Sequence, residues 1–181
     1  MNQNINKIKK FSWVFRLFIK SLVIVIPVYY LMYWIFINQL PTTLITVNSA
    51  PKLILEHPLE IKFQAIGFLF AIPVLLSLIY GLLNIDKLFG FYQKGMVFSY
   101  GQVRLFKNIS KALIFWVVSS VIYQSAKSVL FTLHNPPGQR MLNVEFGSAE
   151  IMIIIVAVLA IFVAWVVEEG RRLSEEQKYT V

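Results

Sequence analysis

The sequence contains no cysteine among its 181 residues. Disulfide bonds, thiolate nucleophiles and cysteine-based metal sites are therefore excluded. Only 14% of the residues are charged while 57% are hydrophobic, which is too apolar for a soluble domain of this size. The sequence also lacks a P-loop, a dinucleotide-binding glycine fingerprint, a zinc-protease motif and a nucleophile elbow. We therefore predict a non-enzymatic protein without a cofactor.

The hydrophobic residues are gathered into four runs of about 20 residues, the length that crosses roughly 30 Å of hydrocarbon as a helix. A backbone exposed to lipid must satisfy its own hydrogen bonds, so we predict an all-α membrane protein. The four helices form one domain over residues 1–181, an antiparallel bundle. They cover about residues 14–37, 63–93, 100–133 and 149–172, with a short cytoplasmic tail at 173–181. Tryptophans near the expected interfaces support these spans: Trp13, Trp34, Trp116 and Trp165.

The net charge of +8 is distributed by topology. Thirteen of the 17 lysines and arginines precede or begin the first helix, lie between the second and third, or follow the fourth. The two remaining loops hold only Lys52, Lys62 and Arg140. The positive-inside rule therefore puts both termini and residues 86–111 in the cytoplasm. This asymmetry favours anionic lipid headgroups as the partner of the charge, and not nucleic acid.

The second and third helices are longer than a membrane crossing, so we predict that they extend into a cytoplasmic hairpin. Gly95 suits a left-handed helix cap, and Ser99 to Gln102 has the pattern of a capping box. Antiparallel pairing about residue 97 predicts a contact between Asp86 and Lys107. These residues either specify the turn or present a docking surface. The candidate docking residues are Asp86, Lys94, Gly95, Ser99, Arg104, Lys107 and Lys111.

The third helix carries a polar stripe in its outer half. Ser120, Gln124, Lys127 and Ser128 are spaced i, i+4, i+7 and i+8, so they share one face. A polar face inside a membrane is expected to turn toward the bundle or toward water. We expect Glu150, at the start of the fourth helix, to be the partner of Lys127. The stripe is either a polar pathway or ligand pocket, or a packing surface with Lys127 reaching outward.

The two outer loops contain the remaining features. Residues 44–47 and 140–146 have the composition of two short strands that could pair. The two histidines, His57 and His134, both fall in these loops. We interpret them as unrelated loop residues, in preference to a metal or haem pair.

Two blocks of residues have a recognisable pattern. The first lies between the second and third runs: Leu88, Phe89, Tyr92, Lys94, Gly95, Val97, Phe98, Ser99, Val103, Leu105 and Ile109. The second lies at the C-terminal end: Glu169, Gly170, Leu173, Glu175, Glu176, Gln177, Thr180 and Val181. Together they resemble the DUF2975 family of bacterial membrane proteins, a domain of unknown function. The resemblance implies a multi-pass protein of the bacterial inner membrane. Family members are often encoded beside a small helix-turn-helix protein, which implies a membrane-held regulator as the partner.

Two functions of different classes follow from these features. The first is a binding or regulatory membrane protein that docks a small helix-turn-helix regulator or a companion membrane subunit. The alternative is a small transporter or immunity-type protein that uses the polar stripe and the helix kinks expected at Pro27 and Pro73. The oligomeric state stays open, because four helices can close a bundle alone or share a core in a homodimer.

Overall fold

The computed structural model describes residues 2–40, 58–96 and 99–179, and over these ranges the chain is helical with no strand. The elements are α1 (Asn2–Ile35), η1 (Ile37–Gln39), α2 (Ile61–Gln93), α3 (Tyr100–Thr132) and α4 (Ser148–Tyr179). Segments of all four α-helices are long and apolar enough to cross a membrane: Lys7–Ile35, Ile61–Gln93, Tyr100–Thr132 and Ser148–Leu173. The predicted all-α architecture with four long apolar helices is confirmed.

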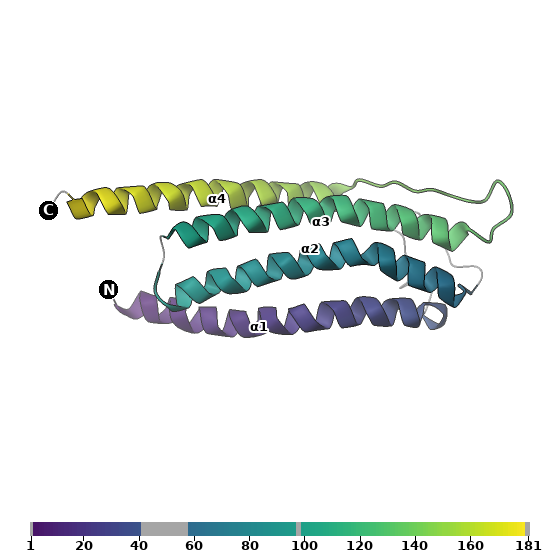
Figure 1. Ribbon diagram of the computed structural model, residues 1–181, viewed down its shortest axis with the longest axis horizontal. Coiled ribbons are helices and arrows are strands. Elements are labelled where there is room, and N and C mark those ends of the chain that lie inside the picture. The colour runs from purple at the N-terminus through teal and green to yellow at the C-terminus, as the bar shows by residue number, and fades with distance from the viewer. Residues whose placement is uncertain (1, 41–57, 97–98, 180–181) are drawn as a thin grey trace.

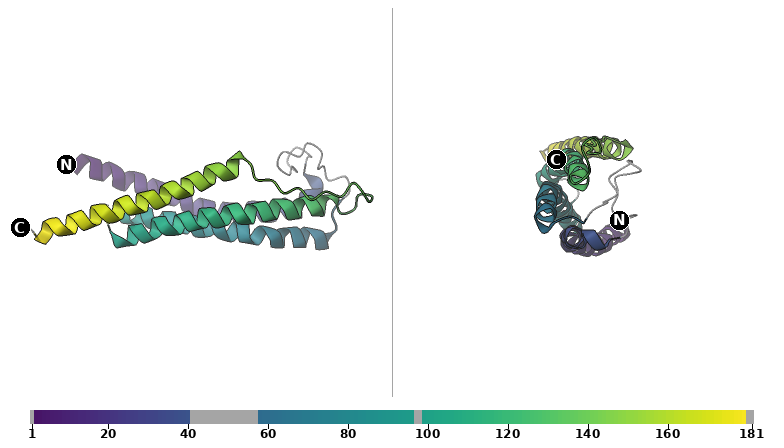
Figure 2. Two further views of the ribbon diagram at one scale, coloured as in Figure 1. Left: turned by 90° about the horizontal axis from the view of Figure 1, so that it is seen from above. Right: turned by 90° about the vertical axis from the view of Figure 1, so that its right-hand side faces the viewer.

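Consecutive helices run antiparallel, and each packs on the next one along the chain (Figure 1). Seen end-on, the four helices form an arc that begins at α1 and finishes at α4 (Figure 2). No extensive contact joins α1 to α4 in the described residues. Both termini lie at the same end as the α2–α3 turn, which we name the basic end (Figure 1). The opposite end, with residues 36–40, 58–60 and 133–147, we name the loop end.

Two helices are longer than the sequence predicted. Helix α1 begins at Asn2 and not near residue 14. This extension packs on α2 through Phe11, whose ring centroid lies 6.3 Å from that of Phe89. Helix α4 continues to Tyr179, so the segment expected to be a tail is helical over 173–179. Ion pairs within the helix explain this extension, because Arg171 and Glu175 are spaced i, i+4 and lie 2.7 Å apart.

The core of the loop end is built around Trp34. Its ring is only 2% exposed, and its Nε1–H donates to the hydroxyl of Tyr123 at 3.1 Å. The rings of Tyr33 and Phe131 also pack on it. We name these four side chains the aromatic core. A Cβ at Gly67 would overlap the indole ring, so a glycine is required where α2 approaches α1. Trp34 therefore lies near the end of its helix as expected, but inside the bundle and not among lipid headgroups.

The loop between α3 and α4 is attached through side chains of α3. The backbone N–H of Met141 donates to Thr132 Oγ1 at 3.0 Å, and that of Asn143 donates to Ser128 Oγ at 2.9 Å. The strand predicted at 140–146 is therefore wrong, because hydroxyls of a helix bind this backbone in place of a second strand. Its proposed partner, 44–47, lies outside the described residues.

Candidate functional site

The turn at the basic end is held by specific capping contacts. Gly95 has φ +77°, in the left-handed region that glycine favours. Ser99 Oγ accepts the backbone N–H of Gln102, and Gln102 Oε1 accepts that of Ser99 at 2.9 Å. The Gln102 amide also donates to the carbonyl of Met96 at 2.9 Å, and its side chain is fully buried. The predicted capping box and left-handed glycine are confirmed, and together they fix α3 relative to α2.

Asp86 does not contact Lys107, so that prediction is wrong. Its carboxylate instead accepts two hydrogen bonds from Arg16 of α1, at 2.9 Å from Nε and 3.2 Å from Nη2. Arg16 Nη1 also donates to Gln93 Oε1 at 2.8 Å. The side chains of Arg16 and Asp86 are 29% and 16% exposed. Sequence reasoning missed Arg16 as this partner, although it lies directly before the apolar run of α1.

The physical reason is the direction in which Asp86 points from its helix. Two residues earlier, Asn84 faces α3, where its Oδ1 accepts a hydrogen bond from Asn108 at 3.2 Å. Two residues rotate a helix by about 200°, so Asp86 points away from α3 and toward α1. Lys107 in turn reaches α4, where Nζ lies 3.4 Å from Glu168 Oε2.

The other candidate cations at this end remain exposed. Lys94, Arg104 and Lys111 form no ion pair in the part of the chain that the structure describes. Lys87, which sequence reasoning did not select, shares both properties. The positive charge of the basic end is therefore largely uncompensated by the chain itself.

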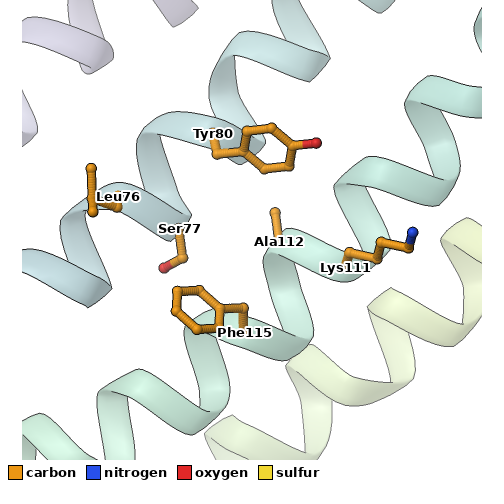
Figure 3. Close-up of a pocket in the computed structure, with 6 residues that line it drawn as sticks. All are labelled: Leu76, Ser77, Tyr80, Lys111, Ala112 and Phe115. Atoms are coloured by element: carbon orange, nitrogen blue, oxygen red, sulfur yellow. The ribbon is translucent and has the colours of Figure 1, made fainter.

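A hollow of about 430 Å³ opens between the middle of α2 and α3. Figure 3 shows its lining residues: Leu76, Ser77, Tyr80, Lys111, Ala112 and Phe115. The Ser77 hydroxyl is already bonded to the carbonyl of Val74 at 2.7 Å, and the Lys111 side chain extends away from Ser77 (Figure 3). The hollow thus offers apolar surface without the convergent polar groups that an active site needs.

The polar stripe of α3 is turned into the bundle. Ser120, Lys127 and Ser128 are buried, and Gln124 is partly buried. Ser128 Oγ donates to the carbonyl of Ser125 and accepts the N–H from the loop described above. This hydroxyl is engaged at both its donor and its acceptor, as expected of a structural contact.

Lys127 extends into the aromatic core. Its Nζ lies 5.2 Å from the ring centroid of Tyr33, 5.7 Å from that of Phe131 and 5.8 Å from that of Tyr123. These distances are typical of cation–π contacts. The structure shows Glu150 in a different contact from the one expected. Its Oε2 accepts the N–H of Gly147 at 2.9 Å, because a glutamate in the first turn can cap its own helix.

Only one of the two histidines lies in the described residues. The ring of His134 packs edge-on against Phe63, with centroids 5.4 Å apart, and His57 lies outside the described residues. Within the ranges that the structure covers, no group of three histidine or acidic side chains is suited to hold a metal ion.

One of three comparisons with known proteins found a match. A family model described as "Protein of unknown function (DUF2975)" matches residues 3–181, essentially the whole chain. No curated protein and no solved structure is significantly similar to it. The match covers all four apolar helices as well as both sequence blocks, at the α2–α3 turn and at the C-terminal end. The chain therefore belongs to the DUF2975 family of proteins of unknown function.

Proposed function

We propose that this multi-pass membrane protein is a non-enzymatic docking protein, whose basic end lies in the cytoplasm and binds a soluble partner there. The observation that carries the proposal is the fixed geometry of exposed charge. The capped turn holds α2 and α3 in one arrangement. Lys94 beside the turn, and Arg104 and Lys111 along α3, are exposed and form no ion pair with the described residues. A fixed array of unpaired charges favours a partner with a complementary acidic face.

The proposed orientation is that of a bacterial inner-membrane protein with both termini inside. Thirteen of the 17 basic residues belong to the termini and the α2–α3 hairpin, which share one end of the bundle (Figure 1). The positive-inside rule assigns such an end to the cytoplasm. Helices α2 and α3 have 33 residues each, or about 50 Å, against roughly 30 Å of hydrocarbon. We therefore propose that the hairpin projects beyond the membrane on the cytoplasmic side.

The partner we propose has a surface that can lie along α3. Arg104, Lys107 and Lys111 are spaced i, i+3 and i+7, so they follow one face of this helix. Lys107 is shared with Glu168 of α4, which leaves Arg104 and Lys111 as the principal contacts. The small helix-turn-helix regulator implied by the family resemblance is the first partner to test, and a companion membrane subunit is the second.

The alternative of a small transporter has weaker support. A pathway along α3 would need polar groups that a moving substrate can reach. Ser128 is instead bonded to the α3–α4 loop, and Lys127 lies among the rings of the aromatic core. Those contacts support a structural role for the stripe.

Docking is tested with the full chain purified from its native membrane in a mild detergent and examined by native mass spectrometry. We expect the encoded neighbour regulator in a stoichiometric complex, lost in the variant Arg104→Gln/Lys111→Gln. The matched control Lys62→Gln/Arg140→Gln removes two cations from the loop end and should retain the complex. A complex that survives the first variant, or disappears in both, contradicts docking at this surface.

Orientation is tested separately, and the absence of cysteine makes the experiment simple. Lys94→Cys and Gln139→Cys each introduce one thiol, at the basic end and the loop end respectively. A membrane-impermeant maleimide should label Gln139→Cys in spheroplasts and Lys94→Cys only in inside-out vesicles. The reverse pattern would overturn the orientation.

A further inference from the structure

A second hollow, of about 420 Å³, lies at the basic end against α1, α2 and α3. Its lining combines cations, small residues and an apolar wall: Arg16, Asp86, Lys87, Gly90, Phe91, Lys94, Gly101 and Leu105. We name it the basic hollow. Lys87 and Gly90 of α2, and Lys94 directly after its last residue, are spaced i, i+3 and i+7. Two lysines therefore flank a position without a side chain.

The two glycines keep the basic hollow open. A Cβ at Gly90 would lie 3.6 Å from the guanidinium carbon of Arg16, in ordinary contact, so a longer side chain there would extend into the space. A Cβ at Gly101 would lie only 2.8 Å from the ring of Phe91, so this wall of the hollow depends on the glycine.

The charge lining the basic hollow is not balanced. One carboxylate, Asp86, faces three cations: Arg16, Lys87 and Lys94. Neither lysine makes an ion pair in the described residues. Arg16 uses three N–H donors on Asp86 and Gln93. A guanidinium carries five donors, so two remain for a ligand. The basic hollow is therefore suited to bind an anion that accepts several hydrogen bonds.

We propose that the basic hollow binds the phosphate headgroup of an anionic membrane lipid. A phosphate group offers the acceptor oxygens and the negative charge that two lysines and an arginine can bind together. Basic pockets between membrane helices on the cytoplasmic side typically bind the headgroups of such lipids. Phe91 and Leu105 add an apolar wall, which a free phosphate ion would not use but the glycerol and first methylenes of a lipid would.

The neighbouring surface of α1 supports a lipid over a soluble anion. Trp13 and Leu17 lie within one turn of Arg16, about 60° and 100° around the helix from it, and both are more than half exposed. Exposed apolar side chains beside a phosphate site provide a surface for acyl chains. The proposed orientation enters only in assigning the lipid to the cytoplasmic leaflet, and binding itself does not depend on it.

The test uses the full chain in a nonionic detergent, where no leaflet asymmetry exists. Phosphatidylglycerol or phosphatidylcholine is added, and native mass spectrometry counts the bound lipid. We expect phosphatidylglycerol to bind about tenfold more tightly than phosphatidylcholine. Lys87→Gln/Lys94→Gln should abolish this preference. The matched control Lys10→Gln/Lys20→Gln removes two exposed cations of α1 outside the hollow and should keep it. Equal binding of both lipids, or equal losses in the two variants, would overturn the proposal.

A second variant tests whether lipid binding needs the open volume of the basic hollow, with its charge unchanged. Gly90→Leu keeps every cation and fills the basic hollow, so it should lower phosphatidylglycerol affinity as much as the double variant. Wild-type affinity in a Gly90→Leu protein with cooperative thermal unfolding would show that the lipid binds elsewhere.

Inorganic phosphate at the same concentration should neither displace the lipid nor raise the melting temperature. If it does both, the site is for free phosphate. Gly90→Leu also separates the two proposals: it should lose lipid binding and keep partner docking, because Lys94, Arg104 and Lys111 are unchanged.

Discussion

The two ends of the bundle are held together by different means. At the loop end, α1, α2 and α3 meet around the buried aromatic core, with Trp34 bonded to Tyr123 and fitted against Gly67. At the basic end, the helices are joined by partly exposed polar contacts such as Arg16–Asp86. Beside them lie a hollow and several cations that form no ion pair with the described residues. A filled apolar core specifies helix packing, whereas uncompensated surface charge is available to other molecules. We therefore expect stability to depend most on the loop end, and we propose binding at the basic end.

The largest expected effect tests the close fit of the loop end. Gly67→Ala should lower the free energy of unfolding by about 3 kcal/mol, because the added Cβ forces the Trp34 ring out of its position. Thermal or denaturant unfolding in detergent measures the change. The same substitution at Gly90, on the same helix, meets only ordinary contacts, so Gly90→Ala should be neutral or stabilising. Equal effects of the two substitutions would remove the contrast between the ends.

The next effect concerns the ion pair that links α1 to α2 at the basic end. Asp86→Asn should cost about 1–2 kcal/mol, because it weakens a bidentate, half-buried pair and leaves the Arg16 guanidinium without its counter-charge. A double-mutant cycle with Arg16→Gln isolates the coupling between the two side chains. The corresponding cycle of Asp86 with Lys107 should give no coupling. Coupling to Lys107 in place of Arg16 would show that α2 is rotated about its axis relative to the arrangement described here.

These two sites also show what the sequence can and cannot predict. Hydrophobic run lengths predicted four helices, and the bounds of α3 agree to within one residue, because Ser99 provides a cap whose signal is local. The predicted contact of Asp86 with Lys107 was wrong, because the direction of a side chain depends on the rotation of its helix. Each residue along a helix changes that direction by about 100°. The burial of Trp34 was missed for a related reason. A tryptophan near a helix end is typical of an interface, and the space that Gly67 provides depends on tertiary packing.

The candidate sites likewise include features that the sequence predicted and features that depend on tertiary packing. The polar stripe was predicted from its spacing to face the bundle or water, and Ser120, Lys127 and Ser128 are buried while Gln124 is partly buried. Its contacts with the α3–α4 loop could not be predicted, since they involve backbone N–H groups that carry no sequence signal. The basic hollow was missed because its lining comes from three helices. Only the spacing of Lys87, Gly90 and Lys94 along α2 was available as a signal.

A smaller effect is expected at the turn that fixes the hairpin. Ser99→Ala should lower the free energy of unfolding by about 1 kcal/mol, because it removes the side-chain acceptor for the Gln102 N–H. The control Ser21→Ala removes an exposed hydroxyl that bonds only within its own helix, and should cost less than about 0.5 kcal/mol. Hydrogen exchange at residues 100–103 is the second measurement, since a lost cap should speed exchange locally. Unchanged exchange there would mean that the turn is held by packing alone.

The smallest effect is expected at the Lys107–Glu168 contact between α3 and α4. Both side chains are more than 40% exposed and the atoms lie 3.4 Å apart, so Lys107→Gln should cost no more than about 0.5 kcal/mol. Salt should remove even this difference, because exposed pairs are screened at high ionic strength, while the cost of Asp86→Asn should persist. Measuring both variants at low and high salt separates the two contacts. If Lys107→Gln proved as costly as Asp86→Asn and equally insensitive to salt, the α3–α4 contact would be a second fixed link at the basic end. Lys107 would then belong to the framework of that end and not to its docking surface.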